Sequence, residues 1–228
     1  FFLWNTTASG RELWTSDGTA AGTRLVRDSN PQQLTAYRGK LLFVTRNPSR
    51  GFELWGSDGT PSGTQMIRGF GGIFTDGLVE IIGTHGGNAI VAVIDPAGSR
   101  ALEFWQTNGT AAGTIRLHRT PLGIPNSPAH VSSKQVEDGR LFFTAETAAH
   151  GKELWVTDGT KSGTRLVVDL VPGPTSSEAS PALALRHRVV VRAGSPSRRK
   201  TWLSDGTATG TYTLASLIPG ATIDGWFF

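Results

Sequence analysis

Acidic and aromatic side chains recur together along this sequence at a fixed spacing, and they are the first candidates for chemistry. A Glu lies two residues before a Trp, and an Asp or Asn followed by Gly-Thr lies three residues after it; the copies begin at Glu12, Glu53, Glu103 and Glu153. A fifth copy keeps Trp202 but has Lys200 in the place of Glu. Such carboxylates could act as acid catalysts or calcium ligands, and the indoles could stack on sugar rings.

The recurring Asp is interpreted as a turn cap rather than as a metal ligand. Its side-chain oxygen can accept backbone N–H groups two or three residues on, while the following Gly takes the positive φ of a tight turn. The third copy carries Asn108, and an amide caps a turn as well as a carboxylate does but binds a hard cation poorly. The sequence therefore predicts structural turn caps at Asp17, Asp58, Asn108, Asp158 and Asp205.

The recurring Glu is interpreted as a hydrogen-bonded side chain of a strand. Residues two apart on a strand share a face, so each Glu lies on the same side as the Trp that follows it. Copies in neighbouring sheets would be too far apart for paired acid catalysis, since glycosidase carboxylates lie about 5–9.5 Å apart. A buried carboxylate needs a partner, and a repeated one is expected to have a repeated partner. The tryptophans are expected to pack between neighbouring sheets.

Other site chemistry is sparse in this sequence. The chain has no Cys, which excludes disulfides, thiolate metal sites and cysteine nucleophiles. The 5 His residues show no zinc-ligand spacing, the Gly-Gly pairs do not precede a helix pattern, and no Gly-x-Ser-x-Gly segment occurs. We therefore predict no catalytic residue, no metal site and no cofactor, and we expect a protein that is not an enzyme.

The charge and hydropathy of the chain set limits on its partners. The net charge is +4, from 22 basic and 18 acidic residues, and the basic residues are scattered. This pattern permits anionic partners but does not favour nucleic acid. No apolar run approaches the roughly 20 residues of a membrane-spanning helix, so no membrane insertion is expected. Since the sequence begins at Phe1 without a Met or a signal peptide, we expect a processed product or a part of a longer chain.

The repeated residues must be positioned by sheets that follow one another along the chain. Each copy holds short apolar or β-branched runs typical of four strands, without a sustained helical period. Four strands in a repeat of 41–50 residues are typical of a β-propeller blade, because stacked blades cover both faces of each sheet. We predict an all-β fold, a single β-propeller domain over residues 1–228 with five blades of four antiparallel strands, centred on Trp14, Trp55, Trp105, Trp155 and Trp202.

The two ends of the chain look complementary. The segment Asp224-Gly-Trp-Phe-Phe228 is similar to Asp138-Gly-Arg-Leu-Phe-Phe143, which enters a second strand, and Phe1-Phe2 matches Phe142-Phe143. The C-terminus would then supply the inner strand that the first repeat lacks, so that ring closure is shared between the N- and C-termini. We expect a monomeric ring, and five repeats cut from a longer array would give the same pattern.

The full motif, Glu-Leu-Trp-x-x-Asp-Gly-Thr-x-x-Gly-Thr, resembles that of the ELWxxDGT repeat proteins. These are exported bacterial proteins built of tandem copies and generally taken to be β-propellers, and the resemblance covers nearly the whole chain. It implies a secreted or cell-surface location, and it carries over no catalytic residue. Asn108 and Lys200 depart from the motif.

The loops that differ between the copies are where function is expected, because binding residues tend to sit on loops of a rigid scaffold. Arginine pairs bidentately with carboxylate or sulfate, which favours an anionic glycan, another surface polymer or a protein at the cell surface. The candidate ligand-binding residues are Arg46, Arg50, Arg100, Arg119, His150, Arg198 and Arg199. A non-catalytic, lectin-like or adhesion module is the favoured function. Two alternatives stay open: a propeller-type hydrolase that uses Asp76, Asp95 or Glu146, and a structural spacer within a larger surface protein.

Overall fold

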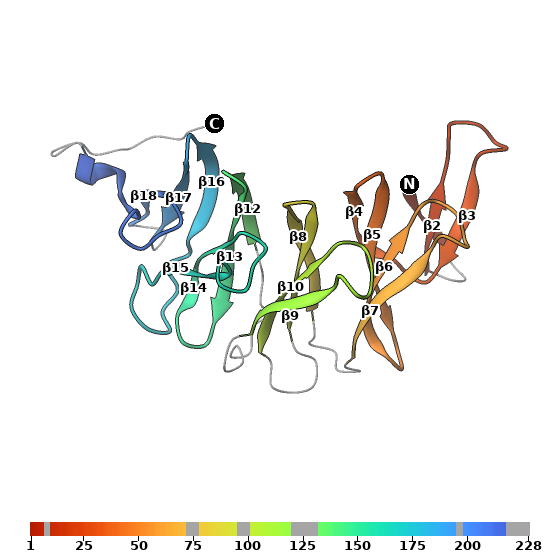
Figure 1. The fold of residues 1–228 in the computed structure, drawn as a ribbon, viewed down its shortest axis with the longest axis horizontal. Coiled ribbons are helices and arrows are strands. Elements are labelled where there is room, and N and C mark those ends of the chain that lie inside the picture. Colours follow the sequence, from red (N-terminus) through yellow and green to blue (C-terminus); the bar gives the residue numbers. More distant parts are fainter. Residues whose placement is uncertain (7–9, 72–77, 95–100, 120–131, 195–197, 218–228) are drawn as a thin grey trace. The chain divides into compact units, whose positions relative to one another are not determined.

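The computed structural model describes the chain except for residues 7–9, 72–77, 95–100, 120–131, 195–197 and 218–228 (Figure 1). The chain falls into two compact units, residues 1–121 and residues 122–228. Among the described residues every regular element is a β-strand, apart from one short 3-10 helix at Leu214–Leu217. The predicted all-β class is therefore confirmed.

Three antiparallel sheets make up the first unit, and in each of them strands that follow one another in the chain are hydrogen-bonded. The first sheet contains β1 (Phe2–Thr6), β2 (Gly10–Thr15) and β3 (Arg24–Asp28). The second contains β4 (Gln32–Tyr37), β5 (Lys40–Asn47), β6 (Gly51–Ser57) and β7 (Gln65–Gly71). The third contains β8 (Leu78–His85), β9 (Asn88–Ile94), β10 (Leu102–Thr107) and β11 (Ile115–Arg119).

Two further antiparallel sheets of four strands make up the second unit. The fourth sheet contains β12 (Ser132–Glu137), β13 (Arg140–Thr147), β14 (Gly151–Thr157) and β15 (Arg165–Val168). The fifth contains β16 (Ser180–Leu185), β17 (Arg188–Ala193), β18 (Lys200–Ser204) and β19 (Tyr212–Thr213). Each sheet thus holds one copy of the repeated motif, on its third strand where the sheet has four.

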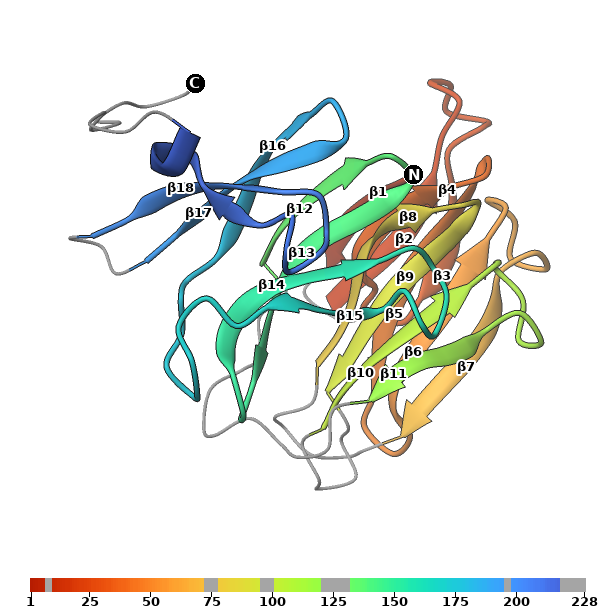
Figure 2. The ribbon, with the colours of Figure 1, turned by 60° about the vertical axis from the view of Figure 1, so that its left-hand side comes forward.

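Neighbouring sheets of a unit pack face to face, as Figure 2 shows for the β4–β7 and β8–β11 sheets, and these two sheets bury apolar side chains between them. Trp55 packs with Leu13 and Val26 of the first sheet, and Trp105 belongs to a cluster that also contains Tyr37 of the second sheet. In the second unit, Trp202 packs against a cluster that spans the fourth and fifth sheets. The expected packing of tryptophans between sheets is therefore confirmed at these three positions.

The first sheet differs from the other four because it has three strands among the described residues. Its β1 pairs Phe2 with Trp14, as β5 pairs Phe43 with Trp55, so β1 corresponds to the second strand of a complete sheet. The predicted completion of this sheet by the C-terminus concerns residues 218–228, which lie outside the described residues.

Candidate functional site

The Asp-Gly-Thr turns follow one hydrogen-bond plan in all five copies. In the second copy, Asp58 Oδ1 accepts the N–H of Thr60 at 2.9 Å and its hydroxyl at 2.7 Å. Thr60 Oγ1 accepts the N–H of Gly63 at 2.9 Å. In the third copy, Asn108 Oδ1 accepts the same two bonds from Thr110 at 3.0 and 2.7 Å. An amide therefore caps this turn with the same contacts as a carboxylate.

Each turn contains two glycines, and a different physical constraint requires glycine at each position. The first glycine has a φ between +79° and +95°, which favours glycine over every other residue, at Gly18, Gly59, Gly109, Gly159 and Gly206. The second has no positive φ, but a Cβ on it would overlap the oxygen of the capping Asp or Asn, at Gly22, Gly63, Gly113, Gly163 and Gly210. The repeated motif is therefore a packed turn in which cap and glycine require each other.

The turn hydrogen bonds also stabilise the ionised carboxylates. The hydroxyl and N–H of Thr60 lower the pKa of Asp58 below its ordinary value of 3.8, and the N–H and hydroxyl of Thr19 lower the pKa of Asp17. At Asp205 burial acts to raise the pKa, and hydrogen bonds from Thr207 together with nearby arginines lower it by more. These carboxyl groups stay charged at neutral pH.

The repeated Glu finds a repeated partner in the indole of its own motif. Trp14, Trp55 and Trp105 donate their Nε1–H groups to Oε2 of the Glu two residues before, at 2.9, 3.1 and 2.9 Å. The expected hydrogen-bonded Glu is thus confirmed in these copies. In the fourth copy Glu153 is fully buried and accepts the hydroxyl of Ser177 at 2.7 Å, and its burial raises its pKa.

A cavity of about 420 Å³ lies between the first and second sheets, at the end of the blades where the loops vary. Basic and amide side chains from both sheets line it, together with two acids: Arg27, Asp28, Asn30, Arg46, Asn47, Arg50 and Glu53. Its residues come from the end of β3 and from the β5–β6 hairpin, where Asn47 Oδ1 accepts the N–H groups of Ser49 and Arg50. The structure thus brings two of the predicted arginines, Arg46 and Arg50, to one cavity.

The arginines of this cavity are held by neighbouring aromatic and acidic side chains. The Arg27 guanidinium lies over the Trp55 ring, 3.6 Å from its centroid, and Arg46 lies over Phe52 at 5.8 Å. Arg50 Nε pairs with Glu53 Oε1 at 3.0 Å, while 62% of the Arg50 side chain is exposed. Three cations are therefore positioned around two acids, of which Glu53 is already bonded inside the sheet.

Sequence reasoning missed Arg27, although a signal for it exists. Arg27 follows the Trp of its own copy by 13 residues, and Arg68 does the same in the second copy. Each lies over the Trp of the next sheet, since Arg68 is 4.1 Å from the centroid of Trp105. Burial lowers the pKa of Arg27, and a guanidinium remains charged at neutral pH nonetheless.

The other predicted ligand residues lie in different surroundings. Arg119 Nε pairs with Glu103 at 3.1 Å in the third sheet, and Arg100 lies outside the described residues. In the second unit, His150 Nδ1 lies 3.0 Å from Asp169 Oδ2. Arg198 and Arg199 are exposed before β18. None of these residues that the structure describes lines the arginine cavity between the first and second sheets.

Of the three acids named for a hydrolase, Glu146 alone lies within the described residues. Asp76 and Asp95 lie outside the described residues, and Glu146 is half-buried on β13. Among the described residues no group of three or more His, Asp and Glu side chains is placed to hold a metal ion. The described part of the chain also contains no helix with the length and apolar character that crossing a membrane requires.

Comparison of sequences finds no match: no family model fits the chain, and no curated protein matches it. Solved structures do resemble it in fold. A prolyl endopeptidase structure matches 93% of this chain at a TM-score of 0.53 and 12% identity, over 32% of its own chain. The tricorn protease matches 89% of this chain at 0.47 and 14% identity, over 20% of its own chain.

A third similar structure is the β-propeller domain of the trilobed protease from Pyrococcus furiosus, with a TM-score of 0.38, 15% identity, and coverage of 93% of this chain and 79% of that domain. This chain spans about a third of the prolyl endopeptidase and a fifth of the tricorn protease. At such identities the likeness concerns fold alone. Together with the five successive antiparallel sheets, it defines an all-β, propeller-like protein.

Proposed function

We propose that this chain is a non-catalytic binding module that holds an anionic group of an acidic glycan or surface polymer in the cavity between the first and second sheets. One observation carries the proposal: Arg27, Arg46 and Arg50 line a single cavity of about 420 Å³ at the variable-loop end. A guanidinium forms two parallel hydrogen bonds with a carboxylate or sulfate, which a ligand of this class supplies along its length.

The cavity is organised before a ligand arrives. Arg27 is stacked on Trp55 and Arg50 is tethered by Glu53, so less side-chain freedom is lost when an anion binds. Asn30 and Asn47 add amide groups for neutral hydroxyls beside the anion. Because Arg50 is largely exposed, its contribution is screened by salt, and affinity falls as ionic strength rises.

The experiment compares polygalacturonate with neutral dextran by surface binding at low and high salt. The proposal expects the acidic polymer to bind and the neutral polymer to bind far less, with binding weakened by salt. Arg46→Gln should lower the affinity at least about tenfold, as removal of a charged hydrogen bond of roughly 1.5–3 kcal/mol requires. Lys161→Gln, in an exposed turn of the fourth copy, removes the same charge and should bind like the wild type.

Equal binding of both polymers, or an equal loss in the Arg46 and Lys161 variants, would contradict the proposal. If neither polymer bound, the structural-spacer alternative would replace it.

We also propose the family, the cellular location and the ring closure of this module. We place it among the ELWxxDGT repeat proteins, as a secreted or surface-exposed five-bladed ring closed by the C-terminal segment. The repeated motif supports this family, and the three-stranded first sheet supports the closure. Deletion of residues 218–228 should then expose the edge of β1 and cause aggregation, which light scattering would detect. A truncated chain that stayed monomeric with an unchanged melting temperature would contradict the closure.

A further inference from the structure

Gly56 lies on a strand, one residue before its end, where nothing in its backbone calls for glycine. It follows Trp55 on β6, and the residues that follow Trp in the other copies are Thr15, Gln106, Val156 and Leu203. Gly56 does not have a positive φ, so a residue with a side chain could adopt its conformation. A glycine inside a strand weakens the strand and often marks a place where a ligand or another backbone approaches closely.

A hollow lies beside Gly56, between the second and third sheets of the first unit. Two adjoining cavities of about 380 and 230 Å³ both contact Lys40, Gly56, Gly109 and Thr110. They lie at the Asp-Gly-Thr turns, at the opposite end of β6 from the arginine cavity. The larger one falls within the usual range of small-molecule sites, about 300–1,000 Å³.

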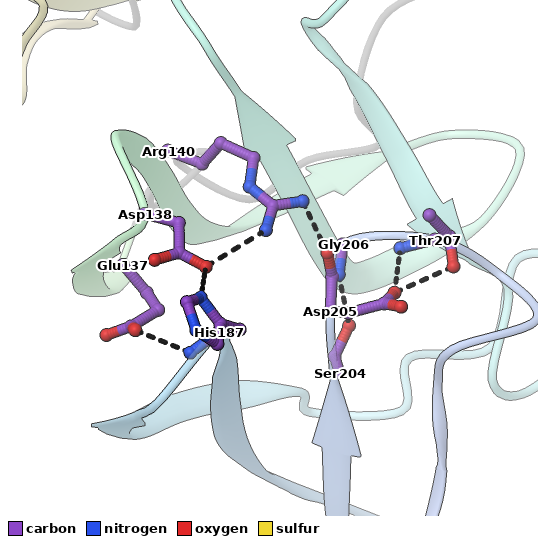
Figure 3. A network of polar contacts seen from close by, with 8 residues as sticks. All are labelled: Glu137, Asp138, Arg140, His187, Ser204, Asp205, Gly206 and Thr207. Carbon is purple, nitrogen blue, oxygen red and sulfur yellow. Dashed lines mark hydrogen bonds and ion pairs between the residues drawn. The ribbon is translucent and has the colours of Figure 1, made fainter.

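The second unit shows how the corresponding hollow is filled. Arg140 opens β13 as Lys40 opens β5, and it donates a hydrogen bond from Nη1 to the carbonyl oxygen of Asp205 in the turn of the next sheet (Figure 3). Asp205 is the counterpart of Asn108. Val156, which corresponds to Gly56, is 1% exposed. Side chains thus occupy in the second unit the place that is open in the first.

Lys40 does not close the hollow as Arg140 does. Its side chain is exposed, and its ammonium group makes no hydrogen bond or ion pair with the residues that the structure describes. Asp58 faces the same cavity from the second sheet, and Asn108 belongs to the opposite turn in the third. In the larger cavity Lys40 and Asp58 are the charged side chains, and Gly56 and Ile67 offer an apolar surface. The smaller cavity adds the Arg38 guanidinium and the amide of Asn108.

We propose that this hollow is a second binding site, specific for a neutral pyranose ring. A pyranose has an apolar face that fits the surface at Gly56, and hydroxyl groups that both donate and accept hydrogen bonds. Its hydroxyls donate to the Asp58 carboxylate and to the Asn108 carbonyl, in the role that the Arg140 guanidinium plays toward Asp205, and accept from Lys40. Because Lys40 and Asp58 balance each other in charge within the larger cavity, a neutral ligand suits that cavity better than an ion. This site does not depend on the anion-binding function proposed above.

The test uses the full chain and a panel of methyl glucopyranoside, galactopyranoside and mannopyranoside, titrated by NMR up to tens of millimolar. At least one sugar should bind saturably to the wild type. Gly56→Val installs the residue of the fourth copy, and its Cβ would lie 3.2 Å from Ile67 Cδ1 and 3.9 Å from Leu42 Cδ2, so the end of the Ile67 side chain must shift slightly. This variant should lose at least about tenfold in affinity, and its melting curve should show that it still folds cooperatively. Gly69→Ala adds a Cβ in open space on the neighbouring strand and should bind like the wild type.

Lys40→Ala provides a second variant. Because the Lys40 side chain is exposed, its removal costs no packing, and the variant should weaken sugar binding as well. The absence of binding by every sugar, or unchanged affinity in both Gly56→Val and Lys40→Ala, would overturn the proposal. The two sites fail separately: Arg46→Gln should keep the pyranoside affinity, and Gly56→Val should keep the binding of polygalacturonate.

Discussion

Replacing the second glycine of one repeated turn should destabilise the protein in a way that depends on the capping side chain. In the Gly63→Ala variant, the new Cβ would overlap both carboxylate oxygens of Asp58. The φ of Gly63 is not positive, so the backbone itself tolerates alanine. The three heavy atoms nearest to the new Cβ all belong to Asp58, so either the turn opens or Asp58 gives up its bonds to Thr60.

The size of the effect follows from packing. Forcing an extra carbon into a well-packed place costs about 1–3 kcal/mol, and Gly63 also donates its N–H to Thr60 inside the same turn. The free energy of unfolding, measured from urea titrations followed by tryptophan fluorescence, should fall by about that amount. The slope of the titration should stay unchanged, because the fold of the sheets is kept.

The matched control is Gly69→Ala on β7 of the same sheet, where a Cβ meets nothing within 4 Å. It should leave stability unchanged or raise it by about 0.5–1 kcal/mol, since glycine is unfavourable within a strand. In the double variant Asp58→Ala/Gly63→Ala, the clash disappears, so the loss should be smaller than the sum of the two single losses. Equal stabilities of Gly63→Ala and Gly69→Ala, or strict additivity in the double variant, would refute this account of the turn.

Two further perturbations test the carboxylates of the repeat. The pKa of Asp58 is lowered, so its contribution to stability is present above the ordinary value of 3.8 and is lost as pH falls through the lower folded value. Asp58→Asn should therefore have the same free energy of unfolding as the wild type at neutral pH, because Asn108 caps its own turn with the same contacts. In acid the variant should lose less stability than the wild type. An equal loss of stability in urea titrations at low pH would contradict this. In the fifth copy, Trp202 Nε1 is buried without a hydrogen-bond partner in the described part of the chain. Lys200→Glu should supply one and raise stability by about 0.5–1.5 kcal/mol, whereas Lys200→Met should not, as melting curves would show.

The parts of this protein that depend on local spacing could be predicted from its sequence. The motif length and the apolar runs indicated antiparallel sheets, and the exchange of Asp for Asn108 indicated a cap, because both features are decided within a few residues. The Trp partners of Glu12, Glu53 and Glu103 also lie two residues away on the same strand face. The blades and their turns are thus encoded separately in each copy.

The candidate sites could not be predicted in the same way, because each is made where two copies meet. Arg27 stacks on Trp55 of the next sheet, and its spacing of 13 residues from Trp14 becomes informative only when it is compared with Arg68 in the second copy. The hollow at Gly56 likewise depends on Lys40 in one sheet and Asn108 in another. The turns keep one hydrogen-bond plan in every copy, while single residues that face the neighbouring sheet differ from copy to copy. An open site in a propeller-like protein can therefore be recognised by comparing equivalent positions between copies. Here the comparison is of Lys40 with Arg140 and of Gly56 with Val156.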